Sequence, residues 1–456
     1  MEMLKHKYLM ALPLIGLLSL TALTQYHHVK EYYDEILNST DLVFEDFDNK
    51  LRTENEQAAQ DEEKYKKLLR AEGNLQEELS EQEGGEGAEQ LDTKSKITNT
   101  KLSLHASSAL LLDASNNRVL FEQNGFKRMP MASTTKIMTC IVTLENAKLT
   151  DVVEVSSNAA RMPDVQLNVR TGEQYYLKDL LFSLMLESHN DVAVAIAEHV
   201  GGSVEGFATM MNDKARELGC ENTNFITPNG LDAEGHYTTA RDLAVIASYA
   251  VKNRTFLEIT NTSSHAFQEI KKGRSFNVTN KNKFLYMMEG AIGVKTGFTG
   301  DAGYCFVGAV KRQDKSFISV VLGCGWPPNK SLKWSDTKEL MTYGINNYKE
   351  RQIFKNSKLD PILVKKGQQN YEDLYMNGDL TLLMRDDEKV TTEVHLPDYV
   401  DAPIKANTVI GEMKYYINKE YYDSVPIYTS SNIPKINYIY CLHKLLNLWN
   451  CNLLVE

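Results

Sequence analysis

The sequence contains few cysteines and no cysteine cluster. Its 6 cysteines are scattered over 456 residues, and none belongs to a Cys-x-x-Cys pair. This scatter excludes a small disulfide-stapled module, and it gives no ligand set for a metal, so we expect no metal site. Most of the cysteines lie in apolar helical or strand-like runs, where a thiol packs as a small hydrophobic side chain.

Long apolar runs are also scarce. Residues 8–23 form the single stretch long and apolar enough to meet a membrane, which excludes a multi-span transporter. Lys5 and Lys7 precede this run, so we predict a signal peptide or a retained signal anchor over residues 1–24, with a buried core helix as the alternative. Positive charge on its N-terminal side predicts that the rest of the chain is exported.

The net charge of −11 comes from one segment. Residues 31–92 contain 20 acidic and 6 basic side chains, a balance of −14, which leaves +3 for the rest of the chain. No basic stripe stands out there, so nothing indicates nucleic-acid binding. Residues 25–98 are rich in Glu, Gln and Lys and poor in large apolar side chains, which predicts an acidic low-complexity spacer, with a trimmed pro-segment as the alternative.

Residues 99–356 have the sequence pattern of a globular domain. Residues 109–124 predict two strands around a turn, residues 133–148 a buried helix, and residues 177–202 two helices with a break at 188–190. Residues 290–324 predict a strand, a turn and a strand. Because helices lie between an early and a late strand pair, we predict an α+β fold with one sheet built from both ends of the domain.

The sequence pattern changes twice in the C-terminal part, first to short strand-like runs and then to an amphipathic helix. Short alternating runs separated by turn residues predict a small all-β domain, a β-sandwich, over residues 357–430. Residues 431–456 predict an amphipathic helix with leucines on one face and Lys444 opposite. This helix lies either on a membrane surface or on its own β-domain, and the sequence leaves both alternatives open.

Ser133 and Lys136 have a spacing suited to nucleophilic catalysis. On a helix, residues i and i+3 share a face, so the Lys136 amine lies beside the Ser133 hydroxyl. A serine hydroxyl needs a nearby base, and a desolvated lysine with a lowered pKa can act as one. Alone the pattern is weak, because Ser335-x-x-Lys338 repeats it, and a helix N-cap is the alternative role for Ser133.

Two further motifs follow in order. Ser188-x-Asn190 comes 55 residues after Ser133, at the predicted helix break. Lys295-Thr296-Gly297 comes 107 residues later on a predicted strand, and this tripeptide occurs once in the chain. The ordered trio resembles the penicillin-recognising serine enzymes, which include penicillin-binding proteins and β-lactamases.

A wider stretch, from about residue 102 to residue 428, resembles the low-molecular-weight D-alanyl-D-alanine carboxypeptidases. It includes MASTTKIMT, LKDLLFSLMLESHND, TNFITPNGLD, TTARDLA and GVKTGFTGDAGYC, with DAPIKANTVIGEM in the β-domain. The resemblance implies a β-lactamase/transpeptidase-like catalytic domain at 99–356 and a membrane-anchoring tail. It also implies removal of the terminal D-alanine from peptidoglycan stem peptides, without a cofactor, at the outer face of the cytoplasmic membrane or in the cell wall. β-Lactams would inhibit it by mimicking the substrate.

The resemblance assigns catalytic roles residue by residue. Ser133 would attack the D-Ala-D-Ala carbonyl and form an acyl-enzyme, and Lys136 would take its proton. Ser188 would relay a proton to the leaving amine. Water would then release the shortened peptide.

Substrate contacts are implied in the same way. Asn190 would hold the peptide amide of the substrate together with the lysine base. Lys295 and Thr296 would bind the terminal carboxylate, and Gly297 completes their motif. The backbone N–H of Phe298 and that of the nucleophile would form the oxyanion hole.

His189 departs from the family, which usually has Gly in the middle of the second motif; we expect an exposed side chain, with a narrowed cleft or altered pH profile as the alternative. His236 lies in a predicted turn, and we expect it to be structural. Asn407 stands where a turn glycine is common, and Asn tolerates the left-handed conformation.

The same residues argue against other functions. A class A β-lactamase would carry a Glu-x-x-Leu-Asn segment between the second and third motifs, and residues 191–294 contain none. A catalytically silent wall-binding protein is disfavoured because every reactive side chain is present. A minor transpeptidase or endopeptidase activity shares the acylation chemistry and stays open.

Overall fold

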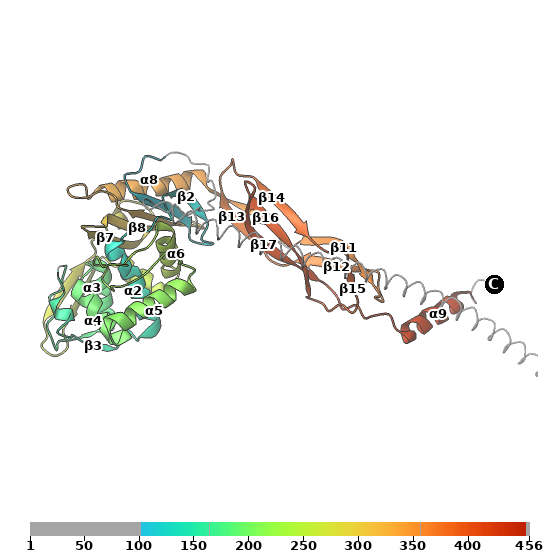
Figure 1. Ribbon diagram of the computed structural model, residues 1–456, viewed down its shortest axis with the longest axis horizontal. Helices are drawn as coiled ribbons and strands as arrows, with labels where there is room; N and C mark the ends of the chain where they lie inside the picture. The colour runs from blue at the N-terminus through green and yellow to red at the C-terminus, as the bar shows by residue number, and fades with distance from the viewer. Residues whose placement is uncertain (1–101, 164, 356, 453–456) are drawn as a thin grey trace, which may run out of the picture. The chain divides into compact units, whose positions relative to one another are not determined.

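The computed structural model describes residues 102–163, 165–355 and 357–452, which all belong to one unit, Lys94–Glu456. The export segment predicted at residues 1–24 and the spacer predicted at 25–98 lie outside the described residues. An α+β body comes first in the described chain, and strands predominate after it (Figure 1).

A five-stranded antiparallel sheet in the order β2-β1-β9-β8-β7 organises the α+β body. Its strands are β1 (Ser108–Asp113), β2 (Val119–Gln123), β7 (Ala291–Thr299), β8 (Gly303–Arg312) and β9 (Lys315–Leu322). Since β1 pairs with β9, the prediction of an α+β fold whose sheet uses both ends of the domain is confirmed. The late region contributes three strands where two were predicted, because residues 300–302 and 313–314 each form a turn.

Helices cover both faces of this sheet (Figure 1). On one face, α8 (Leu332–Asn347) packs Leu340 and Met341 into a cluster with Phe306 and Phe317 of the sheet. The opposite face carries α2 (Lys136–Asn146), α3 (Leu177–Leu186), α4 (Asn190–Gly201), α5 (Val204–Glu217), α6 (Ala240–Ala250) and α7 (Arg254–Asn261). The predicted break at residues 188–190 therefore separates α3 from α4.

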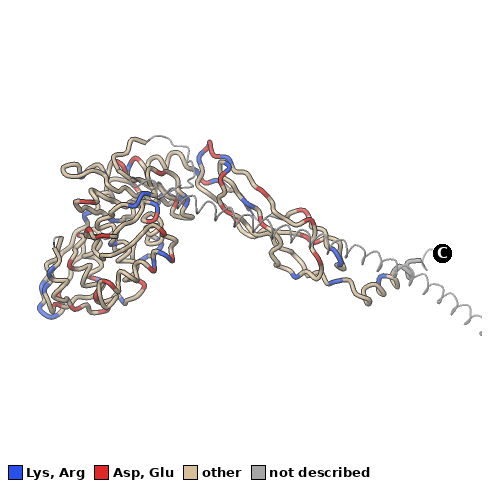
Figure 2. The backbone as a smooth tube through the Cα atoms, viewed as in Figure 1, with Lys and Arg blue, Asp and Glu red and all other residues tan. Residues whose placement is uncertain are grey.

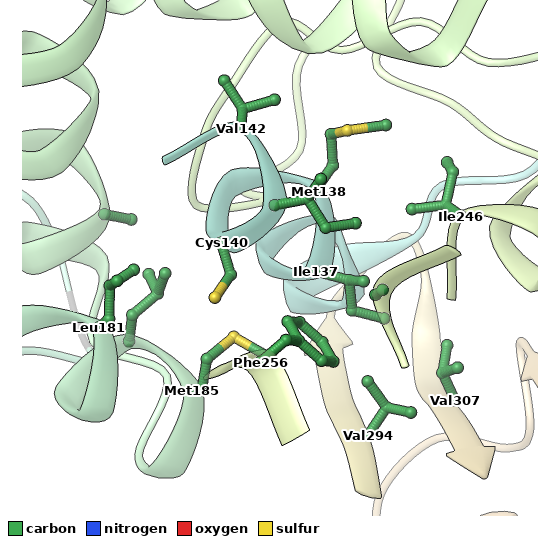
Figure 3. Close-up of a cluster of buried hydrophobic side chains, with 14 of the residues drawn as sticks. Ile137, Met138, Cys140, Val142, Leu181, Met185, Ile246, Phe256, Val294 and Val307 are labelled. Atoms are coloured by element: carbon green, nitrogen blue, oxygen red, sulfur yellow. The ribbon is translucent and has the colours of Figure 1, made fainter. Parts of the chain in front are cut away.

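α2 lies in the centre of the larger core. The sequence predicted a buried helix here, and residues 136–143 are all buried, including the polar ones. Figure 3 shows this packing: Ile137, Met138, Cys140 and Val142 of α2 lie among side chains of other elements, namely Leu181, Met185, Ile246, Phe256, Val294 and Val307. Because close-packed interiors resist displacement, this packing fixes the start of α2 relative to the sheet.

Short elements connect the helices. The Thr239 hydroxyl caps α6 by accepting the Asp242 N–H at 3.0 Å. The remaining connections of the α+β body are the 3₁₀ turns η1 (Ala132–Thr135), η2 (Ala159–Arg161) and η3 (Lys283–Tyr286) and the two-stranded pairs β3 (Val152–Glu154) with β4 (Gln174–Tyr176) and β5 (Ser264–Gln268) with β6 (Ser275–Thr279).

Between α8 and residue 429 every described element is a strand, which confirms the predicted all-β character. One sheet has the order β14-β16-β17-β12-β11-β15, and β10 pairs with β13. Asn407 adopts φ +62, the left-handed conformation that the sequence suggested. The strands are β10 (Lys349–Phe354), β11 (Ser357–Lys365), β12 (Tyr371–Met376), β13 (Leu380–Met384), β14 (Val390–His395), β15 (Tyr399–Asp401), β16 (Val409–Ile417) and β17 (Glu420–Thr429).

The last described helix is α9 (Tyr438–Asn452). Ile439, Leu442, Leu445 and Leu446 are exposed, whereas Tyr440 is half-buried and its hydroxyl donates to the Gln368 carbonyl at 2.7 Å. Among residues 102–452, apart from the two positions left out, no helix combines the length and the apolar character needed to cross a membrane.

The cysteines and charges follow ordinary patterns. Cys140, Cys220, Cys305 and Cys324 are buried free thiols, as predicted for small hydrophobic side chains. Basic and acidic side chains are interspersed along the described chain (Figure 2).

Candidate active site

Ser133 lies in η1, the 3₁₀ turn that leads into α2, and Lys136 is the first residue of α2. The Lys136 Nζ lies 2.9 Å from the Ser133 Oγ. Residues three apart are nearly eclipsed in a 3₁₀ turn, so this turn aligns the pair even more directly than an α-helix does. Ser133 is not the N-cap of α2, since Thr135 holds that position.

Three acceptors hold the fully buried Lys136 amine. Besides the serine hydroxyl, Nζ donates to Asn190 Oδ1 at 2.8 Å and to the Asn229 carbonyl oxygen at 2.6 Å. Asn190 therefore reaches the lysine, as the resemblance implied.

Burial controls the protonation of Lys136. Desolvation, reinforced by the nearby positive charge of Lys295, holds the pKa of Lys136 well below its ordinary value, although Asp191 partly opposes this effect. A lysine with a lowered pKa gives up its proton readily. The neutral amine can then accept the proton of the adjacent Ser133 hydroxyl.

Ser188 lies at the break between α3 and α4 with φ +75, a left-handed conformation that non-glycine residues rarely adopt. Its Oγ is buried and has no hydrogen-bond partner among the described residues. Strained backbone and unpaired buried hydroxyls are both features that functional sites retain. Asn190, two residues on, begins α4 and donates from Nδ2 to the Pro163 carbonyl at 3.2 Å.

β7 brings the third motif against η1. A Cβ on Gly297 would lie 3.0 Å from the Ser133 nitrogen and 3.1 Å from Ala132 Cβ, so glycine permits this close approach. The buried Lys295 amine donates to the Thr296 carbonyl at 3.0 Å, and burial lowers the pKa of Lys295 to about 7. The three motifs thus meet at one place.

Phe298 follows the motif at the end of β7. Its side chain is 42% exposed and packs on Tyr304 with ring centroids 4.6 Å apart. The aromatic ring therefore sits at the surface of the strand rather than among the buried amines.

The sequence also matches known family models. A model of the D-alanyl-D-alanine carboxypeptidase family matches residues 94–325, about half of the chain. The chain belongs to this family. A model of the C-terminal domain of penicillin-binding protein 5 matches residues 348–435.

Individual relatives agree with the assignment. The carboxypeptidase DacF of Bacillus subtilis is 30% identical over 359 residues, which cover 77% of this chain and 91% of the relative. DacC of Escherichia coli is 28% identical, covering 73% of this chain and 85% of its own. Penicillin-binding protein 5 from Haemophilus influenzae has a similar structure, with a TM-score of 0.63, 26% identity and coverage of 74% of this chain and 100% of that chain. The resemblance drawn from the motifs is confirmed.

The sequence analysis missed the Asn229 carbonyl, which accepts a hydrogen bond from Lys136 in this site. The turn at residues 226–231 delivers it: Gly230 has φ +80, and a Cβ there would lie 2.1 Å from the Ala132 oxygen. Thr139 of α2 also donates to the Pro228 carbonyl at 2.6 Å. A backbone acceptor leaves no side-chain pattern in a sequence. The Asn-Gly pair signals a turn with a left-handed position and nothing more.

Asp191 was missed as well. Its two carboxylate oxygens accept the N–H groups of Leu167 at 3.0 Å and Val169 at 3.1 Å. This buried carboxylate ties the segment before β4 to the start of α4, and its charge raises the pKa of Lys136. An acidic residue directly after the second motif was the available signal.

His236 supports the same turn. Its Nδ1 accepts the Ile226 N–H at 3.0 Å, so the neutral ring carries its proton on Nε2, which lies 2.9 Å from Thr135 Oγ1. Thr135 in turn donates to the Ala132 carbonyl at 2.8 Å. Burial lowers the pKa of His236 to about 4. The residue is structural, as predicted.

His189 corrects the sequence prediction. We expected an exposed side chain, but only 4% of the residue is exposed. The chain changes direction at the helix break, so Asn190 faces Lys136 while the imidazole packs on α3, with Nδ1 2.7 Å from Ser183 Oγ. Helical periodicity cannot be extrapolated through such a break.

Proposed function

We propose that Ser133 is the nucleophile of the carboxypeptidase reaction in this protein and that Lys136 is its base. The observation that carries this proposal is the Lys136 amine, which is fully buried, has a lowered pKa and lies 2.9 Å from the Ser133 hydroxyl. Ser133 attacks the carbonyl of the D-Ala-D-Ala bond, its proton passes to Lys136, and the C–N bond breaks to release D-alanine. Water then cleaves the resulting ester, which restores the serine and frees the shortened stem peptide.

Ser188 passes a proton to the leaving amine. Its buried hydroxyl, unpaired within the described chain, is available for this transfer. Asn190 orients the base and the peptide amide of the substrate, since its Oδ1 already accepts from Lys136.

The third motif receives the terminal carboxylate. Lys295 has a pKa of about 7, so an arriving carboxylate favours its charged form, and the Thr296 hydroxyl adds a hydrogen bond. Gly297 keeps β7 close to η1. The N–H groups of Ser133 and Phe298 form the oxyanion hole, where fixed donors stabilise the tetrahedral intermediate.

The substrates are peptidoglycan stem pentapeptides that end in D-Ala-D-Ala. β-Lactams mimic this dipeptide, so they acylate the same serine, and the resulting ester is hydrolysed slowly.

The test is the position of the β-lactam adduct. The full chain is incubated with benzylpenicillin, digested and analysed by mass spectrometry. We expect a long-lived adduct on Ser133 that is lost in Ser133→Ala and kept in Ser335→Ala, the matched control at the second Ser-x-x-Lys. An adduct at another residue, or no adduct, would refute the assignment, and rapid hydrolysis of the penicillin would indicate a β-lactamase.

We further propose that the protein is exported through its N-terminal segment and that α9 lies on the membrane surface. Tyr438 is 76% exposed and Leu445 58% exposed, and Ile439, Leu442 and Leu446 are exposed beside them. An amphipathic helix with unburied apolar side chains gains free energy at a lipid interface. Residues 99–356 then carry the reaction, and the β-domain at 357–430 lies between it and the anchor in the chain.

A further inference from the structure

His189 lies between two residues of the proposed machinery, and its imidazole is buried. Nδ1 lies 2.7 Å from Ser183 Oγ in α3, and Nε2 lies 3.4 Å from the Glu187 carboxylate. A carboxylate only accepts hydrogen bonds, so the neutral ring carries its proton on Nε2 and Nδ1 accepts from the Ser183 hydroxyl. The side chain is therefore bonded on the α3 side of the break.

Glu187 extends this arrangement to the next element. Its Oε1 lies 2.9 Å from the Lys281 amine and accepts the Thr279 N–H at 3.0 Å. The end of α3 is thus joined to the end of β6, which gives the imidazole a fixed surface to pack against.

The backbone at the break is strained and held from both sides. The Ser183 carbonyl accepts the Ser188 N–H at 3.2 Å, while the Asn190 N–H donates to the Val165 carbonyl at 2.7 Å. Between these anchors Ser188 has φ +75. A non-glycine residue keeps a left-handed backbone only when the groups packed around it hold it there. Within the motif, the His189 side chain is the group that does so.

We propose that His189 is a positioning residue for acylation: by its hydrogen bond to Ser183 it holds the Ser188 hydroxyl and the Asn190 amide in place beside Lys136. This inference rests on the roles proposed above for Ser188 and Asn190. His189 itself has no contact with the reacting atoms in this scheme.

Charged groups on several elements act on the ring. Burial lowers the pKa of His189, and Lys136 of α2 and Lys295 of β7 act in the same direction, while Asp191 and Glu187 oppose them. The ring is therefore neutral near pH 7 and can accept from Ser183. In acid, Nδ1 gains a proton and can no longer accept.

The test compares acylation by a fluorescent penicillin in full-length variants. His189→Ala and Ser183→Ala each remove one end of the hydrogen bond, and His189→Asn keeps an acceptor near the Nδ1 position. We expect each alanine variant to slow acylation about tenfold, because small displacements of catalytic groups are costly. The double variant should be no slower than either single one, since both remove the same interaction. His189→Asn should retain a rate within about threefold of the wild type, because it restores that interaction.

Ser248→Ala is the matched control. Ser248 is also a buried serine, in α6, and its hydroxyl donates to the Ala114 carbonyl at 3.0 Å. The Ser248→Ala variant should be less stable than the wild type, but its acylation rate per folded molecule should be unchanged. Unchanged acylation in His189→Ala, additive effects in the double variant, or no rescue by Asn would overturn the inference. A wild-type chain that forms no adduct would instead refute the function proposed for Ser133, which separates the two failures.

Discussion

At the scale of single residues, the proposed chemistry depends on two neighbouring buried amines. The positive charge of Lys295 contributes to the lowered pKa of Lys136. In Lys295→Ala that charge is gone, so we expect the pKa of Lys136 to rise and the acid limb of the acylation rate to move to higher pH. Stopped-flow acylation between pH 5 and 10 measures this shift, separately from the general slowing caused by a lost substrate contact. An acid limb that stays in place would show that Lys136 is not the titrating base.

His236 predicts a pH-dependent stability. Its pKa is about 4 in the folded chain and about 6.5 when unfolded, so between these values the unfolded chain binds more protons. This contribution is complete above pH 6.5 and is lost as the pH falls towards 4, by about 3 kcal/mol in total. Urea unfolding at pH 7 and pH 5 should show a smaller pH effect in His236→Gln than in the wild type. Equal pH effects in both chains would contradict this assignment.

The motifs predicted which side chains form the site but not all of their surroundings. Spacing alone paired Ser133 with Lys136, because a local turn brings the two together. Asn190, 54 residues away in the chain, was added by the family resemblance. The Asn229 carbonyl could not be predicted, since a backbone oxygen is available at every residue and tertiary packing alone selects one. His189 was wrongly expected at the surface because its direction depends on how two helices meet.

At the scale of elements, the turn at residues 226–231 controls the approach to η1. Gly230→Ala places a Cβ 2.1 Å from the Ala132 oxygen at φ +80, so the turn must move and carry the Asn229 carbonyl away from Lys136. We expect a stability loss of about 1–3 kcal/mol and acylation slowed at least about tenfold.

The control for this prediction is Gly273→Ala. Gly273 also has positive φ, +66, but no atom lies within 4 Å of the added Cβ. It should lose about 1 kcal/mol and keep its acylation rate. Equal acylation in the two variants would mean that the turn does not position the base.

The helices and strands themselves were largely predictable. Periodicity identified α3, α4 and the strands around both ends of the sheet, because each buries a regular face. The third late strand was missed because the short turn at residues 313–314 contains neither glycine nor proline. α2 was predicted as a buried helix, but the partners of its threonines and lysine could not be predicted, since these polar groups find them only in the folded core.

At the scale of the whole molecule, we expect membrane binding by α9 to be separable from acylation. In a chain that begins at residue 25, removal of residues 437–456 should abolish co-sedimentation with phosphatidylglycerol vesicles and leave acylation unchanged, because α9 carries the exposed apolar side chains. Leu445→Glu should weaken binding in the intact tail. Vesicle binding that survives the deletion would place the membrane contact elsewhere.

The most direct measurement follows D-alanine released from a peptide that ends in Lys-D-Ala-D-Ala. We expect one D-alanine per shortened peptide, with the rate falling at least about a thousandfold in Ser133→Ala and staying unchanged in Ser335→Ala. Release that persists in Ser133→Ala would contradict the proposed nucleophile. No release from the wild type, together with fast penicillin hydrolysis, would contradict the carboxypeptidase function itself.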